Sequence, residues 1–425
     1  MTSPLARHHG QPGQHDVHIS LVGRRDLAGE IYRQLRRAIL DGRLRPGDRL
    51  PPSRELARRL SVSRTTVTVA YDRLTGEGFV TSHVGAGTFV SDDVAKPTRR
   101  PRRVQSSLAP RRIWDGMPLP TVFARPAEFD FRTGIPDAQL FPFETWRRLM
   151  ARELRPSAVG PGFYADPAGH VGLREAIARH LGTARAVVAT ADDVTVTNGT
   201  QQAIDIVARV LLSPGDRVAV EDPGYPVTRL LFESLGARVV GVPVDGEGLV
   251  VDALPPNVRL VFVTPSHQYP LGMPMSLPRR MALLAWAQNH NAAIVEDDYD
   301  SEFRFAGRPI EPLQTLDTDG RVIYVGSFSK TMLATLRLGF VIVPEPLRRA
   351  VQAAKYLTDW HTMLPAQAAL AGFLDDGSFA RHVRKMRAVY GVRHETILRV
   401  LRDEFTGCLD VVPSTAGLHV SAISQ

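Results

Sequence analysis

The sequence predicts an α/β protein in two parts: a small helical unit that ends in a β-hairpin, and a larger unit built on a mostly parallel sheet. Helical periodicity and turn signals over residues 21–91 predict the first part. Seven short β-branched runs, separated by helical stretches between residues 194 and 343, predict the second. The uneven distribution of charge is the third observation, because it divides the chain in the same region.

Positive charge is concentrated in the N-terminal quarter of the chain. Residues 1–112 hold 21 Lys and Arg against 10 Asp and Glu, whereas the remaining residues hold 31 against 34. A cationic first unit is typical of a protein that meets a polyanion, and double-stranded DNA is the first candidate. The charge balance of the second unit is that of an ordinary soluble domain.

Composition also indicates the compartment. The single Cys408 excludes an intrachain disulfide framework, and residues 1–20 lack the apolar core of a signal peptide. No apolar run approaches the roughly 20 residues that cross a bilayer, so no membrane insertion is expected. We expect a cytoplasmic protein with a disordered tail over residues 1–20, whose four histidines fit a polar tail better than a metal site.

Three short helices are expected in the first unit. Apolar residues at four-residue intervals from Leu27 to Ile39 form one stripe of a first helix, which Asp41-Gly42 ends. Ser53 is the expected N-cap of a second helix, Arg54–Leu60. Ser63 is the expected N-cap of a third helix, whose apolar face is Val67, Ala70, Tyr71 and Leu74.

A hairpin of Phe79–His83 and Thr88–Val90 follows these helices and completes a winged helix-turn-helix layout. In that layout the third helix enters the major groove, with its N-terminal residues nearest to the base edges. Any single arginine could instead lie on a solvated helix face. The predicted DNA contacts are the start of the third helix, one residue of the second helix and the wing: Arg64, Thr65, Thr66, Arg54, His83 and Gly85.

Residues 92–125 are rich in proline, arginine and serine and have little apolar periodicity. We expect a basic linker, which either adds non-specific phosphate contacts or is only a solvated spacer. Residues 126–425 should then form the second unit.

Polar motifs follow the predicted strands of the second unit. In sheets of this kind ligands bind beyond the carboxyl ends of the strands, so these motifs should share one rim. The expected strands are Val194–Thr197, Arg217–Val220, Arg238–Val244, Val258–Val263, Ala292–Val295, Arg321–Val325 and Leu338–Val343.

Lys330 follows one of these strands and is one of only four lysines in a chain whose positive charge is otherwise arginine. An amine that forms a Schiff base must lose its proton, which lysine can do in a desolvated site and arginine cannot. We therefore expect pyridoxal 5'-phosphate (PLP) as cofactor. The alternative is an ordinary surface lysine at a strand end.

Other residues have the chemistry that PLP needs. A phosphate requires backbone N–H groups at a helix start, small hydroxyls and a cation. Gly199, Thr200 and Gln201 open a predicted helix, Ser327 flanks the lysine, and Arg337 lies seven residues beyond it.

For the cofactor ring, Asp297 suits the pyridinium nitrogen and Tyr299 the phenolic oxygen. Asp297 or Asp298 could instead cap the next helix. Tyr225 either stacks on the ring face or packs in the core or a turn.

These motifs carry a family resemblance. Residues 31–90 are similar to the GntR-type winged helix-turn-helix, and the chain from about Asp130 resembles fold-type I aminotransferases. The combination looks like the MocR subfamily of PLP-binding transcription regulators. The motifs that carry it are Leu50–Leu56, Val62–Thr66, Gly85–Val90, Tyr164–Gly169, Thr264–Gln268, Glu296–Phe303 and Ser327–Thr331.

The resemblance implies a PLP-dependent transferase fold, with Lys330 as the aldimine lysine, Asp297 at the ring nitrogen, Tyr299 at the ring oxygen and Arg337 at the phosphate. It also implies a homodimer in which the DNA-binding head of one protomer packs near the aminotransferase-like body of the other.

The chain departs from the aminotransferase pattern in two places. Tyr269-Pro270 stands where those enzymes usually have Asn-Pro, which puts transamination in doubt. The sequence also stops at Gln425, before the arginine that binds the substrate carboxylate in the family, so an incomplete C-terminal small domain is expected.

The predicted function is a transcription regulator that senses an amino acid or amine through an aldimine at Lys330. One alternative is a working aminotransferase with an appended DNA-binding domain. The other is a repressor whose body has lost its cofactor and serves only for dimerisation.

Overall fold

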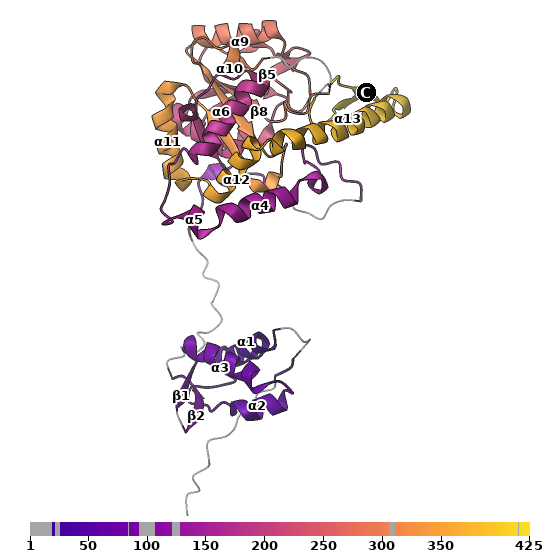
Figure 1. The fold of residues 1–425 in the computed structure, drawn as a ribbon. Coiled ribbons are helices and arrows are strands. Elements are labelled where there is room, and N and C mark those ends of the chain that lie inside the picture. Colours follow the sequence, from indigo (N-terminus) through magenta and orange to yellow (C-terminus); the bar gives the residue numbers. More distant parts are fainter. Residues whose placement is uncertain are drawn as a thin grey trace, which may run out of the picture. The chain divides into compact units, whose positions relative to one another are not determined.

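The computed structural model describes residues 19–21, 26–83, 85–92, 107–120, 128–305, 311–414 and 416–425. The chain divides into two compact units, Met1–Ala109 and Pro110–Gln425 (Figure 1). Most of the predicted tail and most of the predicted linker lie outside the described residues.

The first unit contains the three expected helices and the hairpin. Its apolar core joins the buried faces of all three helices to the hairpin, with Ile31, Leu35 and Leu74 fully buried. The predicted stripe of the first helix and the predicted face of the third are confirmed. The elements are α1 (Leu27–Leu40), α2 (Ser53–Arg59), α3 (Arg64–Gly76), β1 (Val80–His83) and β2 (Gly87–Val90).

The two predicted N-caps have different outcomes. Ser63 caps α3, because its Oγ accepts a hydrogen bond from the backbone N–H of Thr66 at 3.1 Å. The prediction for Ser53 is wrong: Pro52 is the N-cap of α2, and Ser53 is already helical. Pro52 has an extended conformation (φ −53°, ψ 140°), which lets the helix begin at the next residue without a side-chain cap.

The second unit is built on a mixed eight-stranded sheet of order β3-β10-β9-β8-β7-β4-β5-β6. Its central strands pair in parallel, whereas β10 is antiparallel to both β3 and β9. The strands are β3 (Val194–Thr197), β4 (Arg217–Asp222), β5 (Arg238–Asp245), β6 (Gly248–Leu249), β7 (Val258–Val263), β8 (Ala293–Asp298), β9 (Val322–Ser327) and β10 (Gly339–Ile342).

All seven predicted strands are present in this sheet, and the structure corrects the prediction in two details. The eighth strand, β6, has only two residues and pairs antiparallel with β5, so it is too short to give a sequence pattern. Strand β8 continues through Asp298, beyond the predicted end at Val295, because Asp297 and Asp298 still pair with β9.

Helices cover both faces of the sheet (Figure 1). One face of the central strands packs against α7, α8 and α11, and the other face packs against α9. Because both faces of these strands are buried, their sequences are nearly continuous apolar runs. The helices are α4 (Phe143–Glu153), α5 (Pro156–Val159), α6 (Val171–Arg185), α7 (Thr200–Leu211), α8 (Pro226–Ser234), α9 (Leu277–Asn289), α10 (Leu313–Leu316), α11 (Glu345–Asp359), α12 (Leu364–Asp375) and α13 (Ser378–Glu404).

The C-terminal part packs α12 against α4 and α6 and ends in a two-stranded antiparallel pair, β11 (Leu409–Val411) and β12 (Ala422–Ser424). Among the described helices, none is both long and apolar enough to cross a membrane.

Candidate functional site

A cavity of about 420 Å³ lies at the carboxyl-end rim of the large sheet. Residues predicted from four separate motifs, together with Arg337, line one cavity, as expected for a shared rim. The predicted residues in its wall are Thr200, Gln201, Tyr225, Asp297, Tyr299, Ser327, Lys330 and Arg337.

Lys330 lies just beyond β9 and extends into this cavity. Its Nζ donates a hydrogen bond to the carbonyl oxygen of Gly134 at 2.7 Å. Burial lowers the pKa of the Lys330 amine, although Asp300 and Asp297 oppose the shift. The amine is therefore closer to its neutral, nucleophilic form than a surface lysine is.

Asp297 is a buried acceptor that lacks a partner. Its side chain is buried in β8, and its Oδ1 has no hydrogen-bond partner among the described residues. Burial, and then the neighbouring Asp298, raise the pKa of Asp297 to about 8, whereas Lys330 opposes the shift. A protonated ring nitrogen is a cationic donor of the kind that this carboxylate lacks.

Asp298 differs because one of its carboxylate oxygens, Oδ2, has three donors within the fold, whereas its Oδ1 has no partner among the described residues. It accepts hydrogen bonds from Tyr324 Oη at 2.6 Å, Ser301 Oγ at 3.0 Å and Arg185 Nε at 3.1 Å. Burial tends to raise the pKa of Asp298, but Arg185 and these donors hold it below its ordinary value. The alternative that Asp297 or Asp298 caps a helix is therefore wrong, because both lie in β8.

The residues predicted to form an anion cradle lie close together at the start of α7. Gly199 precedes the helix with φ +87°, and a Cβ added there would lie 2.6 Å from Arg337 Nη2, so the backbone and the guanidinium are in close approach. Arg337 donates to the carbonyl oxygen of Asn198 at 2.9 Å. Ser327 lies at the end of β9, where its Oγ accepts from the N–H of Ser329 at 3.1 Å.

A hydrogen-bond network around the buried Lys355 lies next to the predicted cradle. The sequence did not predict this network. Lys355 is fully buried in α11 and donates to Gln202 Oε1 at 3.1 Å, Asp359 Oδ1 at 2.6 Å and Thr362 Oγ1 at 3.1 Å. Asp359 also accepts from Asn198 Nδ2 at 2.6 Å and from Gln202 Nε2 at 2.8 Å. The network thus fixes the residues on either side of Gly199–Gln201.

Aromatic side chains form another wall of the cavity. The rings of Tyr225 and Tyr269 meet edge to face, with their centroids 5.5 Å apart. Burial is the main cause that raises the pKa of Tyr225, and the charge of Asp297 adds to it. Tyr299 Oη lies 3.2 Å from His267 Nδ1. His419 completes this side of the cavity, although it was not predicted as a site residue.

In the first unit, all of the predicted DNA contacts except Thr66 are exposed. Arg54 and Arg64 line one surface hollow together with Arg58, a residue that was not predicted. Thr65 is exposed at the start of α3, whereas Thr66 is half-buried and bonded to Ser63. His83 and Gly85 are exposed at the tip of the hairpin.

Comparison with known families defines the class of the protein. Residues 27–90 match the family of bacterial regulatory proteins, gntR family, and residues 130–421 match the family aminotransferase class I and II. A GntR-type head implies DNA binding, so the chain is a transcription regulator with an aminotransferase-like body. The chain belongs to the MocR subfamily of GntR-type regulators.

Individual relatives support this assignment. The chain is 40% identical to the probable rhizopine catabolism regulatory protein MocR of Rhizobium meliloti, over 92% of this chain and 80% of that protein. It is 36% identical to the HTH-type transcriptional regulator TauR of Rhodobacter capsulatus, over 90% of this chain and 81% of that protein. It is also 33% identical to the HTH-type pyridoxine biosynthesis transcriptional regulator PdxR of Corynebacterium glutamicum, over 92% and 82%.

The body also resembles solved aminotransferases. The kynurenine aminotransferase of Pyrococcus horikoshii superposes with a TM-score of 0.63 at 30% identity, over 67% of this chain and 72% of that chain. The predicted transferase fold is confirmed.

Proposed function

We propose that this regulator holds PLP in the cavity of its body and changes its DNA binding when an amino acid or amine reacts there. The observation that carries the proposal is the pairing, across one cavity, of a lysine with a lowered pKa and a buried carboxylate without a partner. An apolar scaffold would have no use for either group, because both cost free energy when buried.

The described residues fit PLP. Lys330 would hold its aldehyde carbon, Asp297 its ring nitrogen, and Tyr299 its ring oxygen. Tyr225 would contact the ring, and the cradle of Gly199, Thr200, Gln201, Ser327 and Arg337 would hold the phosphate. When bound, PLP supplies an aldehyde that reacts with primary amines and a ring that withdraws electrons.

We further propose residues 21–91 as the DNA-binding head, residues 92–125 as the linker and residues 126–425 as the body. The two family matches and the division of the structure near residue 109 support these limits. The head would dock α3 in the major groove through Arg64, Thr65 and Thr66, with Arg54, His83 and Gly85 on the backbone or the minor groove. A homodimer would present two such heads to one operator in the cytoplasm.

The test compares wild type and Lys330→Ala after incubation with PLP. Wild type should show the visible absorption band of a lysine-bound cofactor, and borohydride reduction should fix the cofactor to the peptide that contains Lys330. Lys330→Ala should lose both signals, whereas Lys385→Ala, which removes an exposed lysine of α13, should keep them. A band of wild-type strength in Lys330→Ala, or label on another lysine, would contradict the proposal.

A working aminotransferase is the second candidate, because the body superposes on enzymes of that class. Tyr269 stands in the cavity wall at the position before Pro270 where the enzymes usually have asparagine. We therefore expect amines to alter the spectrum of the PLP-loaded protein without sustained turnover to a keto acid. Multiple turnovers with an amine donor and a keto-acid acceptor would favour the enzyme.

A further inference from the structure

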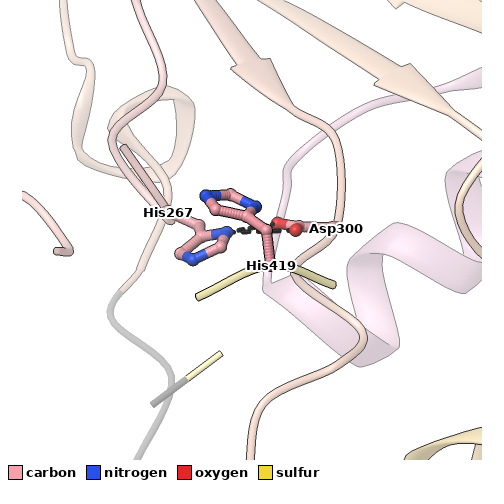
Figure 2. A group of neighbouring side chains, drawn as sticks. All are labelled: His267, Asp300 and His419. Carbon is pink, nitrogen blue, oxygen red and sulfur yellow. Dashed lines mark hydrogen bonds and ion pairs between the residues drawn. The ribbon is translucent and has the colours of Figure 1, made fainter. Parts of the chain in front are cut away.

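A layer of polar side chains packs against Tyr299 and takes no part in the proposed contacts to PLP, although one of its members, His419, also lines the cavity. His267, Asp300 and His419 come together there, although they lie far apart in the sequence (Figure 2). All three are buried, with exposed fractions of 2%, 1% and 9%. Buried polar groups of this kind are retained only where hydrogen bonds satisfy them, so the bonding pattern within the layer is informative.

One nitrogen atom in this layer faces two groups with opposite requirements. His267 Nδ1 lies 3.1 and 3.0 Å from the two carboxylate oxygens of Asp300, and 3.2 Å from Tyr299 Oη. To bond the carboxylate, Nδ1 must carry a proton. To accept the phenolic proton of Tyr299, it must instead offer a lone pair. Both bonds cannot form at once.

Charge decides between the two arrangements. A donor to a carboxylate makes a charge-assisted bond, roughly twice as strong as a bond between neutral groups. The favoured state therefore has Nδ1–H donated to Asp300. In that state the phenolic proton of Tyr299 is not used by His267 and remains available to a ligand in the cavity, which Tyr299 lines.

Residues Ser414 and Ala416–Leu418 of the C-terminal segment hold this arrangement in place. Ser414 Oγ lies 3.3 Å from His267 Nε2 and 2.9 Å from the carbonyl oxygen of Ala416, so its hydroxyl holds the second ring nitrogen of His267 in place. The N–H of Leu418 donates to Asp300 Oδ2 at 3.3 Å. Gly417 has φ +85°, and a Cβ there would lie 1.9 Å from His267 Cε1, so the backbone packs directly on the imidazole ring.

We propose that His267 is a positioning residue: held by Asp300, Ser414 and Gly417, it keeps the phenolic proton of Tyr299 directed into the cavity. The proposal rests on the proposed function, because the acceptor of that proton is the ring oxygen of PLP. It also means that the C-terminal segment and the cavity are coupled, since moving Ser414 removes the contact that holds His267 Nε2 in place.

The same three residues could in principle hold a metal ion, because one potential ligand atom from each lies within 4.8 Å of the others. Hydrogen bonds explain the contacts without an ion. His267 Nδ1 already has the Asp300 carboxylate, and His419 Nε2 donates to the carbonyl oxygen of Pro270 at 3.0 Å. Burial, then His267, lower the pKa of His419 to about 4, so it is neutral and does not compete for Asp300.

The proposal is tested by the pH dependence of the visible band of the PLP-loaded protein. A hydrogen bond from Tyr299 stabilises the deprotonated cofactor, so its loss should raise the pH midpoint of the band. His267→Gln, which cannot reach Asp300 from the Nδ1 position, should raise the midpoint by about one pH unit. Tyr299→Phe should raise it at least as much, and Ser414→Ala should raise it less.

Two variants are controls. His267→Asn should keep a midpoint close to wild type, because its amide can donate to Asp300 from near the Nδ1 position. His180→Asn should leave the midpoint unchanged, since His180 is a partly buried histidine that packs edge to face on Phe379 outside the cavity wall. The titratable groups that face Tyr299 and His267 are Glu221, Tyr269, Asp297, Asp300, Lys330, His394 and His419, and none of these variants changes them.

The outcomes separate this proposal from the proposed function. If wild type shows no band, the proposed PLP site is wrong, and the proposed role of His267 is wrong with it. If the band is present and Tyr299→Phe shifts its midpoint while His267→Gln and Ser414→Ala do not, only the role of His267 is overturned. A midpoint that moves when EDTA is added to wild type would replace the hydrogen-bonded arrangement by a metal site. A Tyr299→Phe protein whose band has the same pH midpoint as wild type would also overturn the proposal.

Discussion

At the scale of single residues, burial moves the two chemical groups of the cavity toward neutrality. It lowers the pKa of the Lys330 amine and raises the pKa of the Asp297 carboxyl to about 8. The cofactor-free site therefore carries less charge at neutral pH than its residue types suggest. A ligand that supplies a cation to Asp297 would restore the carboxylate to its charged form.

This shift gives Asp297 a measurable effect on stability. The pKa of Asp297 is about 8 in the folded protein and lies near the ordinary 3.8 when unfolded, so the folded state binds more protons between these values. Stability should therefore fall as pH rises from about 4 to about 8. In Asp297→Asn this fall should be smaller by up to a few kcal/mol. Melting temperatures of the cofactor-free proteins at pH 5 and pH 8 would show it.

Asp252→Asn, at an exposed position, is the matched control and should keep the wild-type pH dependence. Equal slopes in wild type and Asp297→Asn would show that Asp297 is ionised in the cofactor-free protein. Glu221, Glu296 and Glu302, whose pKa values burial raises to about 7, should leave part of the slope in both proteins.

Residue types in motifs could be predicted, whereas their long-range partners could not. Asp297 lies at the carboxyl end of β8 and Lys330 follows β9, so general rules for parallel sheets bring these two residues to one rim. Arg337 reaches the same rim because the strand that it precedes, β10, is antiparallel to β9. His267 and Ser414 are 147 residues apart. Nothing in either local sequence indicates that they meet, or that one nitrogen has two competing partners.

At the scale of elements, the start of α7 depends on a neighbouring helix. Lys355 of α11 ties together Gln202, Asp359 and Thr362, and Asp359 in turn holds Asn198. In the sequence Lys355 is an ordinary helical lysine, so only packing of α11 against α7 gives it this role.

Lys355→Met should destabilise the protein and weaken the phosphate cradle together. Lys355 is buried but Asp359 is partly exposed, so the substitution leaves Gln202 and Thr362 without the lysine donor rather than a charge buried, at a cost of about 1–3 kcal/mol. We expect a lower melting temperature and a weaker affinity for PLP. Lys385→Met, on the exposed face of α13, should change neither. A Lys355→Met protein with wild-type stability would show that Asp359 is satisfied by its amide donors alone.

The start of α3 is the corresponding element in the head. Arg64 is exposed there and shares a surface hollow with Arg54 and Arg58. Arg64→Ala should reduce operator affinity by about 1–3 kcal/mol if it reads a base, or lower the salt slope by about 1 if it binds a phosphate. Fluorescence anisotropy at several salt concentrations separates the two.

Arg147→Ala removes an exposed arginine from α4 of the body and is the control for net charge. Equal losses in Arg64→Ala and Arg147→Ala would mean that α3 contributes only to the general field of the protein.

Element types were predictable from periodicity, but some boundaries were not. The sequence predicted that the strand ends at Val295, before the acidic residues. In the structure Asp297 and Asp298 still pair with Val325 and Gly326 of β9. Pairing with a neighbouring strand overrode local polarity there. Similarly, the extended conformation of Pro52 started α2 one residue earlier than the capping rule indicated.

At the scale of the whole molecule, a DNA-binding head and a ligand-binding body in one chain make linkage measurable. An amine that favours one state of the PLP-loaded body should change operator affinity by about 5- to 150-fold, the usual range of allosteric coupling. DNA should change the apparent affinity for the amine by the same factor. Lys330→Ala should show neither effect. Operator titrations of the full chain with PLP, with and without each amine, provide the measurement.

Strand β10 also constrains how this family can vary. Because β10 runs back beside β9, the connection between Ser327 and Gly339 leaves and re-enters the sheet at one rim, and it carries both Lys330 and Arg337. Lys330 and Arg337, the proposed anchors for the aldehyde and the phosphate of PLP, are therefore spaced by a single loop. Inserting or deleting even one residue there would change the reach between the two ends of the cofactor, so this loop should accept substitutions far more readily than changes of length.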